Sequence, residues 1–484
     1  MELDRPNPAD HMLMFKKKLW VTEYSTRMQR MLRGEKLPPL RIDAEPHRRC
    51  NLKCVHCARE QADYNINEYS KRVEVPESRW YEIAHESGEM GVKAWNIAGI
   101  GEPMFKPDMM MRLMSIIKEH GMFGELTTNG WYWDDEHIRQ TIEMGWDCIS
   151  ISIDGPDASS HEAIRRMPGS FERACATAKR FSELRRKRRT HLPNLTVNVV
   201  LSRFNYDKLP EMVNLAYKLG ADVLFVEPMV VYNDYQREQV MVTPAQRNYL
   251  KAGLDKALAL SRKRNIYAFF TCLDGDDETK EFNPDLAERG GNMRDVILKG
   301  TLEQAKRYRG DSGNAALAED SLAPFHQIGE VPTEADEETL VRHIMNIPCY
   351  YPWLNLMITA EGNAVHCGEC DVFDVNIKDK SLREIWYGDH LDRFRERHGR
   401  GQLSSFCERC RPNVIGDMKL LRKSLHEYAR PEKLQDKLVK MMEHSLNLKR
   451  ELYYQQHGGF LHPIKNRLFP SDPGTKEKIR IMSL

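Results

Sequence analysis

Residues 40–57 read LRIDAEPHRRCNLKCVHC, and this stretch decides how the rest of the chain is interpreted. Leu40–Glu45 alternates apolar and polar side chains as a β-strand does, and a cysteine loop follows directly. Cys50, Cys54 and Cys57 place three thiols within eight residues, separated by three and then two residues. A 4Fe–4S cubane needs four ligands, so three cysteines leave one iron open to a substrate or a cofactor.

A zinc site is the main alternative for this loop. Structural zinc usually takes its ligands from two CxxC-type pairs, and the loop does not provide two pairs locally. His56 is a further candidate ligand, but it lies between two ligand positions and we expect it to point away. Three free thiols are the remaining alternative.

Length and composition limit the class of protein. A chain of 484 residues favours two or three structural units. The net charge of +1 provides no general attraction to nucleic acid or to an anionic membrane. No apolar run is long enough to span a bilayer and no secretory signal is evident, so we expect a cytoplasmic protein. In that reducing compartment, closely spaced members of the 11 cysteines indicate metal binding or catalysis rather than disulfides.

Strands and helices alternate from residue 40 to about residue 264. Strands are predicted at Leu40–Glu45, Lys93–Ala98, Phe123–Thr127, Asp147–Ile153, Leu195–Leu201 and Asp222–Glu227. The intervening helices are predicted at Pro76–Met90, Pro107–His120, Asp134–Met144, Ser170–Arg189 and Asp207–Leu219, and a last one at about Thr243–Arg264. This alternation predicts an α/β fold, a partial (β/α)6 TIM-like barrel whose loops at the strand C-termini form the working face.

Composition changes divide the chain into five regions. We predict an N-terminal helical extension over 1–39, the partial barrel over 40–273, a small α+β cysteine-rich domain over 346–412 and a helical tail over 413–484. Residues 274–345 are polar and weakly periodic. They are interpreted as an insertion or lid, with a disordered surface excursion as an equal alternative.

The cysteine loop strongly resembles that of the radical S-adenosylmethionine (SAM) superfamily, with Val55 and His56 between its last two cysteines. The resemblance extends over roughly residues 40–270. It implies that SAM binds the open iron through its amino and carboxylate groups. One electron from the cluster then cleaves SAM to a 5′-deoxyadenosyl radical, which abstracts hydrogen from a substrate. The electron would come from a donor such as flavodoxin or ferredoxin.

Candidate SAM contacts follow the second, third and fourth strands. Gly99–Pro103 is similar to the family's glycine-rich, glutamate-containing motif that receives the methionine amine. There Gly99 and Gly101 would let backbone carbonyls approach the amine, and Glu102 would orient it. Asn129 contacts SAM or closes an Asx-turn.

Ser152 and Asp154 are similar to residues that face the SAM ribose or carboxylate in the family. Arg165 lies where relatives often place a basic residue near that carboxylate. A surface helix is the alternative for Arg165 and for His161, and it is the favoured interpretation for His161.

A second set of cysteines lies near the C-terminus. Cys367–Cys370 and Cys407–Cys410 are CxxC pairs that by themselves indicate zinc knuckles. The surrounding sequence instead resembles the SPASM/Twitch extension of radical SAM enzymes, which implies an auxiliary 4Fe–4S cluster. Five cysteines, where a full SPASM domain has seven, are similar to the shorter Twitch form with one auxiliary cluster. The implied ligands are Cys349, Cys367, Cys407 and Cys410, with Cys370 as an alternate ligand or a free thiol.

Three further residues are candidates for catalysis. Cys272 or Cys370 would return a hydrogen atom to a substrate radical, and Glu369 would act as a base. An exposed carboxylate is the ordinary alternative for Glu369. Cys148 and Cys175 are isolated, and we expect both to pack in the core.

The leading functional prediction is a radical SAM oxidoreductase. It would dehydrogenate a small polar molecule, such as a sugar or aminocyclitol, with help from the auxiliary cluster. The first alternative is an enzyme that modifies a peptide or protein by thioether formation, epimerisation or crosslinking. The second is a zinc-binding structural protein. The predicted partners are a small-molecule or peptide substrate and the electron donor, with neither nucleic acid nor membrane.

Overall fold

The computed structural model describes residues 27, 30, 31, 33–61, 66–229, 233–264, 266–270, 350–366 and 375–400. Every described residue lies within Met1–Arg430, the first of the two units into which the chain divides. The predicted insertion at 274–345, the tail at 413–484 and most of the N-terminal extension lie outside the described residues.

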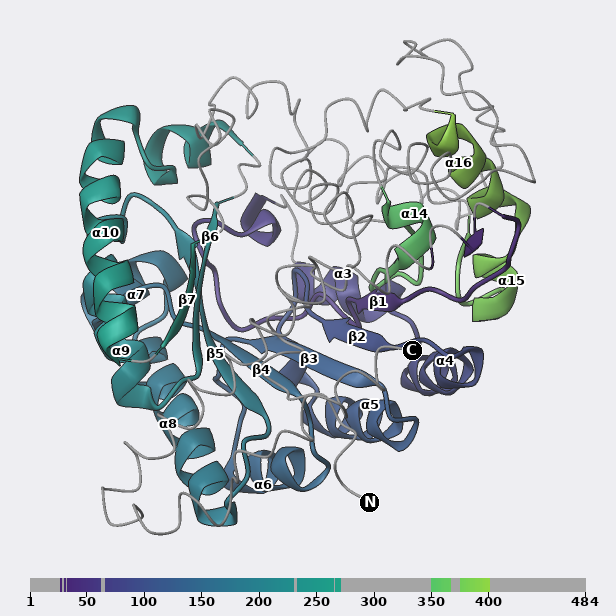
Figure 1. Cartoon of the computed structure of the whole chain (residues 1–484), viewed down its shortest axis with the longest axis horizontal. Helices are drawn as coiled ribbons and strands as arrows, with labels where there is room; N and C mark the ends of the chain where they lie inside the picture. Colours follow the sequence, from purple (N-terminus) through teal and green to yellow (C-terminus); the bar gives the residue numbers. More distant parts are fainter. Residues whose placement is uncertain are drawn as a thin grey trace, which may run out of the picture. The chain divides into compact units, whose positions relative to one another are not determined.

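One nine-stranded sheet organises this unit (Figure 1). Its strand order is β7-β6-β5-β4-β3-β2-β1-β8-β9, and neighbours from β7 to β8 all pair in parallel. The first seven strands are β1 (Arg41–Ala44), β2 (Ala94–Ile97), β3 (Phe123–Thr128), β4 (Cys148–Ser152), β5 (Asn194–Leu201), β6 (Val223–Pro228) and β7 (Tyr267–Phe270). The six predicted strands are thus confirmed in order, and the α/β partial barrel holds.

A row of helices covers the outer face of this sheet (Figure 1). They are α4 (Glu77–Met90), α5 (Pro107–Glu119), α6 (Asp135–Glu143), α8 (Ser170–Arg188), α9 (Leu209–Leu219) and α10 (Arg247–Arg264). Helices that follow one another in this list also contact one another. Six strand–helix units are therefore present, as predicted, and β7 follows the sixth.

Local sequence explains where these elements begin and end. Helix α4 ends at Gly91, which adopts the left-handed conformation with φ 88°. Helix α6 begins after Asp134, whose side chain accepts a hydrogen bond from the backbone N–H of His137. Every residue of β4 is buried, as expected for a parallel strand covered on both faces.

The C-terminal region continues the same sheet rather than forming a separate layer. Strand β8 (Asn355–Ile358) pairs in parallel with β1 and forms a hairpin with β9 (Ala364–Val365). Short helices flank the hairpin: α14 (Tyr351–Leu354), α15 (Leu382–Trp386) and α16 (Asp389–Gly399). A capping box of Ser381 and Glu384 begins helix α15. The pairing with β1, which the sequence did not indicate, satisfies hydrogen-bonding groups that would otherwise line a sheet edge.

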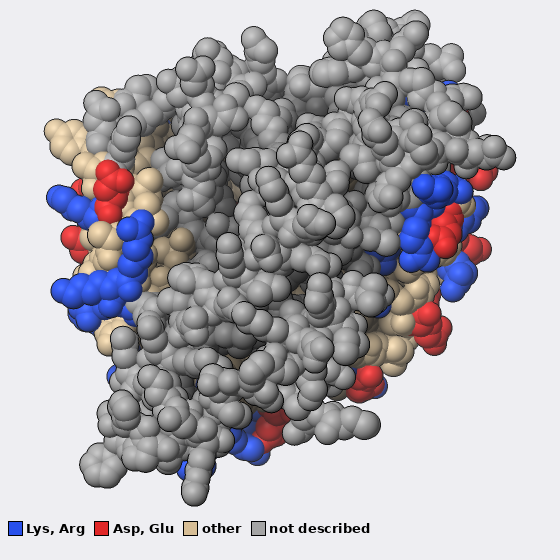
Figure 2. All heavy atoms as spheres, in the orientation of Figure 1, with Lys and Arg blue, Asp and Glu red and all other residues tan. Residues whose placement is uncertain are grey.

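Helix α3 (Ile66–Val73) and the π-helical turn η3 (Gln236–Val240) were not predicted, and α7 (Ala158–Arg165) is the segment for which a surface helix was one alternative. Within the described ranges, no helix is long and apolar enough to cross a bilayer. On the face shown in Figure 2, basic and acidic side chains are interspersed along both flanks of the described part.

Candidate active site

The cysteine loop begins a few residues after β1, at the C-terminal end of the strand. Cys54 is buried, and Cys50 and Cys57 are partly exposed. Burial, the largest cause, and the negative charge of Cys54 together raise the pKa of Cys50 and of Cys57 to about 12. The three predicted ligands are therefore close enough to influence one another electrostatically.

Two side chains hold the N-terminal part of this loop in place. The Arg59 guanidinium donates to the carbonyl of Leu52 at 2.7 Å and to Asn67 Oδ1 at 2.6 Å. The Asn67 carboxamide in turn bonds the backbone of Cys50, accepting from its N–H at 3.1 Å and donating to its carbonyl at 3.2 Å. Both the N–H and the carbonyl of Cys50 are thus hydrogen-bonded to one side chain.

The C-terminal part of the loop is held in place by segments that are distant in the sequence. The Val55 N–H donates to the Ile164 carbonyl at 2.9 Å. Gln236, which is fully buried, donates from Nε2 to the carbonyls of Val55 at 3.1 Å and Cys57 at 3.4 Å. Val55 also packs in a small apolar cluster with Ile164, Met229, Val240 and Met241. Sequence reasoning missed Gln236, because nothing local to a glutamine 179 residues after Cys57 indicates this contact.

The turn after β2 approaches the cysteine loop closely. Gly99 has φ +145°, and a Cβ atom there would lie 2.7 Å from Glu45 Cγ. A Cβ on Gly101 would lie 2.1 Å from the carbonyl oxygen of His47, so only glycine fits. The backbone of this turn and the backbone preceding the cysteines are therefore in direct contact.

The Glu102 carboxylate is buried and satisfied within the protein. It accepts hydrogen bonds from Thr128 Oγ1 at 2.6 Å and from the N–H groups of Asn129 at 2.6 Å and Met104 at 3.0 Å. Burial nevertheless raises the pKa of Glu102 to about 7. The side chain therefore ties the turn after β2 to the end of β3. Its predicted contact with the SAM amine stays a prediction.

Asn129 closes an Asx-turn, one of the two alternatives stated for it. Its Oδ1 accepts from the Trp131 N–H at 2.9 Å. Its Nδ2 donates to Asn51 Oδ1 at 2.9 Å and lies 3.9 Å from Cys50 Sγ. The side chain consequently forms the turn and also lies next to the first cysteine.

Asp154 and Arg165 form a buried ion pair beside the second cysteine. Arg165 Nε lies 2.6 Å from Asp154 Oδ2, and its Nη1 lies 3.6 Å from Cys54 Sγ. Although burial opposes ionisation, the Arg165 charge holds the pKa of Asp154 below its usual value. Ser152 is buried at the end of β4.

The surface position favoured for His161 is wrong, and the surface alternative for Arg165 fails as well. Helix α7 packs its inner side against the site, so His161 is 1% exposed and Arg165 7%. His161 Nδ1 accepts from the Asp154 N–H at 3.2 Å. Burial lowers the pKa of His161 to about 4, which keeps the ring neutral.

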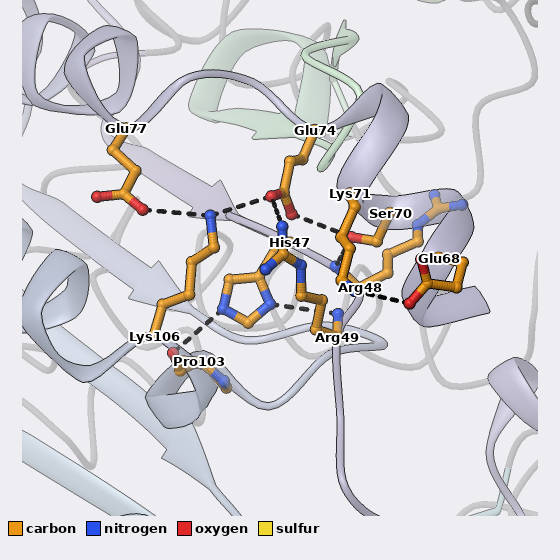
Figure 3. A network of polar contacts seen from close by, with 10 residues as sticks. All are labelled: His47, Arg48, Arg49, Glu68, Ser70, Lys71, Glu74, Glu77, Pro103 and Lys106. Carbon is orange, nitrogen blue, oxygen red and sulfur yellow. Dashed lines mark hydrogen bonds and ion pairs between the residues drawn. The ribbon is translucent and has the colours of Figure 1, made fainter. Parts of the chain in front are cut away.

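A network of charged and polar side chains joins the two loops (Figure 3). Glu74 pairs with Arg49 and with Lys106, whose Nζ lies 3.0 Å from Glu74 Oε1. His47 Nε2 lies 3.2 Å from the Pro103 carbonyl. The residues just before the cysteines are thus connected to the segment that follows the glycine turn.

The remaining predicted site residues lie outside the described ranges. They are Cys272, Cys349, Cys367, Glu369, Cys370, Cys407 and Cys410. The prediction that Cys148 and Cys175 pack in the core is confirmed, since Cys148 is fully buried and Cys175 packs against the core cluster.

The chemistry of the cysteine loop fits an iron–sulfur cluster. Sulfur atoms of such a loop carry negative charge, which N–H donors stabilise. Cys50 Sγ accepts from the Leu52 N–H at 3.4 Å, and the Arg165 guanidinium faces Cys54 Sγ. Among the described residues, no group of three or more His, Cys, Asp or Glu side chains could hold a single metal ion.

Family comparisons agree with this site. Residues 44–216 match the radical SAM superfamily, and residues 349–411 match the SPASM iron–sulfur cluster-binding domain. The chain therefore contains a radical SAM domain and, C-terminal to it, a SPASM domain. These domains imply a 4Fe–4S cluster, SAM and auxiliary iron–sulfur clusters as cofactors.

The chain is similar to several curated proteins named PqqA peptide cyclase. The one from Gluconobacter oxydans is 29% identical over 184 residues, 38% of this chain and 48% of that protein. The one from Xanthomonas campestris pv. campestris is 24% identical over 382 residues, 77% of this chain and 79% of that protein. The match spans about half the length of the first two such relatives, 48% and 46%.

Solved structures with a similar arrangement were also found. Streptococcus suis SuiB bound to S-adenosylmethionine aligns at TM-score 0.48 and 17% identity, covering 73% of this chain and 67% of SuiB. Native anSMEcpe with bound AdoMet aligns at TM-score 0.46 and 15% identity, covering 82% of this chain and 98% of anSMEcpe.

Proposed function

We propose that this chain is a radical SAM enzyme that modifies a peptide. The observation that carries the proposal is the similarity to PqqA peptide cyclase from Xanthomonas campestris, which extends over 382 residues. An alignment covering 77% of the chain is too long for the barrel domain by itself. The peptide-modifying alternative is therefore better supported than the leading prediction, dehydrogenation of a sugar or aminocyclitol.

When bound, SAM and the iron–sulfur clusters would supply hydrogen-atom abstraction and one-electron transfer. Cys50, Cys54 and Cys57 would hold the SAM-binding cluster, with their loop held by Arg59 on one side and Gln236 on the other. The carbonyls of the Gly99–Gly101 turn would receive the methionine amine.

Arg165 would provide positive charge for the methionine carboxylate. Its position is determined by Asp154, because their ion pair is buried and the aspartate oxygen lies 2.6 Å away. A guanidinium held in this way loses little conformational freedom when an anion binds. The reducing power would come from a donor such as flavodoxin or ferredoxin, in a cytoplasmic setting.

The experiment compares two classes of substrate on the same anaerobically reconstituted enzyme. One set holds short peptides encoded beside the gene, and the other holds sugars and aminocyclitols. With SAM and a reductant, we expect 5′-deoxyadenosine release above background only with a peptide. Mass spectrometry should then show that the peptide has lost hydrogen or has changed its connectivity.

The Cys54→Ala variant is the matched control, since it should release no deoxyadenosine with any substrate. If an aminocyclitol stimulated cleavage and was oxidised while every peptide was inert, the peptide proposal would be wrong. The cofactor assignment would survive that result.

A further inference from the structure

A buried group of three charged side chains lies where the C-terminal hairpin meets the barrel. Arg48 is placed between two carboxylates, with Nη1 2.9 Å from Glu361 Oε1 and Nε 3.4 Å from Glu45 Oε2. All three side chains are at most 8% exposed. Charges this deeply buried are costly unless they are paired, so each depends on its neighbours for position.

Glu45 connects this group to the glycine turn after β2. Its Oε1 accepts a hydrogen bond from the Ile100 N–H at 2.7 Å. The bare Cα of Gly99 lies against the same side chain, because a Cβ there would lie 2.8 Å from Glu45 Oε1. The position of Glu45 therefore determines where the backbone of Gly99 and Ile100 lies.

Glu361 lies far from Glu45 and Arg48 in the sequence, and a hydrogen bond holds its backbone in place. It lies in the turn between β8 and β9, where its carbonyl accepts from Asn376 Nδ2 at 3.1 Å. The hairpin is bonded to the barrel at two carbonyls that precede Glu361. The Glu45 N–H donates to the Ile358 carbonyl at 2.9 Å, and the Val75 N–H donates to the Ala360 carbonyl at 3.0 Å.

A continuous chain of contacts thus runs from the SPASM-domain region to the turn after β2. It passes from Glu361 to Arg48, then to Glu45, and ends at the Ile100 N–H. We propose that Glu361 is a positioning residue for SAM, acting through Arg48 and Glu45 on the Gly99–Gly101 turn. This inference rests on the proposed function, in which that turn receives the methionine amine.

The physical reason is the competition for one guanidinium. With Glu361 present, Arg48 is shared between two carboxylates, and Glu45 keeps one oxygen directed at Ile100. Without Glu361, the buried Arg48 keeps a single carboxylate partner, so the geometry of Glu45 changes. A shift there would move the turn, and close backbone contact with a cofactor amine tolerates little displacement.

The test measures SAM affinity rather than turnover. Wild type and Glu361→Gln are reconstituted anaerobically, and the SAM dissociation constant is measured by equilibrium dialysis. Electron paramagnetic resonance of the reduced N-terminal cluster, with and without SAM, is the second readout. We expect Glu361→Gln to retain its iron, to weaken SAM binding by about tenfold, as is typical of coupled sites, and to alter the SAM-dependent change in the spectrum.

Glu86→Gln is the matched control. Glu86 also joins the barrel to the C-terminal region, since it accepts from the Leu382 N–H and pairs with Arg79. Among the described residues, its hydrogen bonds and ion pairs are with Arg79 and Leu382 and not with the glycine turn. This variant should lower the melting temperature and leave the SAM dissociation constant and the spectrum unchanged.

The inference is overturned if Glu361→Gln binds SAM as wild type does while its melting temperature falls as in Glu86→Gln. Should Glu361→Gln fail to fold, Arg48→Lys decides the question, because a lysine keeps the charge but lacks the fork that reaches two carboxylates. Weakened SAM binding in Arg48→Lys supports the inference, and unchanged binding overturns it. A wild-type protein that bound no SAM would instead contradict the proposed function.

Discussion

The cysteine loop after β1 and the glycine turn after β2 lie side by side, but they differ in which of their polar groups form hydrogen bonds within the protein. In the cysteine loop, side chains from other segments form hydrogen bonds with the backbone. Asn67 bonds to Cys50, and Gln236 bonds to Val55 and Cys57. The contacts to the sulfur atoms of Cys50 and Cys54 are long, from 3.4 to 3.9 Å.

In the glycine turn, carboxylate side chains accept hydrogen bonds from the protein itself. Glu102 accepts three hydrogen bonds within the protein, and Glu45 holds the turn at the Ile100 N–H. The comparison suggests a division of work in which the first loop offers side chains to a cofactor and the second offers backbone. Three predictions test this division.

Removing a sulfur should have the largest effect. We expect Cys54→Ala to lose the N-terminal cluster, so iron content should fall by about four atoms per chain and SAM cleavage should stop. Iron analysis and deoxyadenosine release measure both quantities.

Cys148→Ala is the control for this variant, since Cys148 is fully buried in β4. It should keep all of the iron and lose about 1 kcal/mol of the free energy of unfolding. A Cys54→Ala protein with a full iron content would contradict the assignment of side chains to the first loop.

The second prediction concerns the charge on Glu102. Burial raises its folded-state pKa to about 7 from the ordinary value of 4.5, so the protonated form is favoured in the folded protein. The contribution of Glu102 to stability should be fully present below pH 4.5 and be lost as pH rises through 7. Each pKa unit corresponds to about 1.4 kcal/mol.

Denaturant unfolding across this pH range tests the prediction. The difference in unfolding free energy between Glu102→Gln and wild type should change with pH between these limits, by a few kcal/mol at most. Thr128→Val, which removes a donor that lowers the Glu102 pKa, should extend the window to higher pH. A difference that stays constant with pH would show that Glu102 is not shifted in the folded protein.

The smallest effect is expected for Gln236→Ala. This variant removes the donor to the Val55 and Cys57 carbonyls, which leaves buried acceptors unpaired at a cost of about 1–3 kcal/mol. We expect a lower melting temperature and faster loss of iron to a ferrous chelator.

Gln246→Ala serves as the control here, because its carboxamide accepts from Thr243 rather than from the cysteine loop. Equal rates of iron release from the two variants would mean that the backbone of the cysteine loop does not depend on Gln236.

Several features were predictable because their signals are local. Alternation of short strands and helices indicated six β/α units, and three cysteines at close spacing indicated the cluster loop. The Asx-turn at Asn129 and the capping box at Ser381 are also local, since each joins residues two or three positions apart.

Other features depended on residues far apart in the sequence. His161 was expected on a surface helix, because an eight-residue segment shows no strong periodicity to place its buried face. The pairing of β8 with β1 joins segments about 314 residues apart, and no local pattern specifies such a partner.

The sequence by itself determined the class of this protein, because cysteine spacing and strand–helix alternation are properties of short stretches of chain. The tertiary structure decided which polar side chains serve as scaffold and which face the cofactor site. In the sequence, Arg48 and Gln236 look like ordinary polar residues. Only burial and the nearest neighbours distinguish them, because a buried charge or amide must find its partners wherever the fold places them.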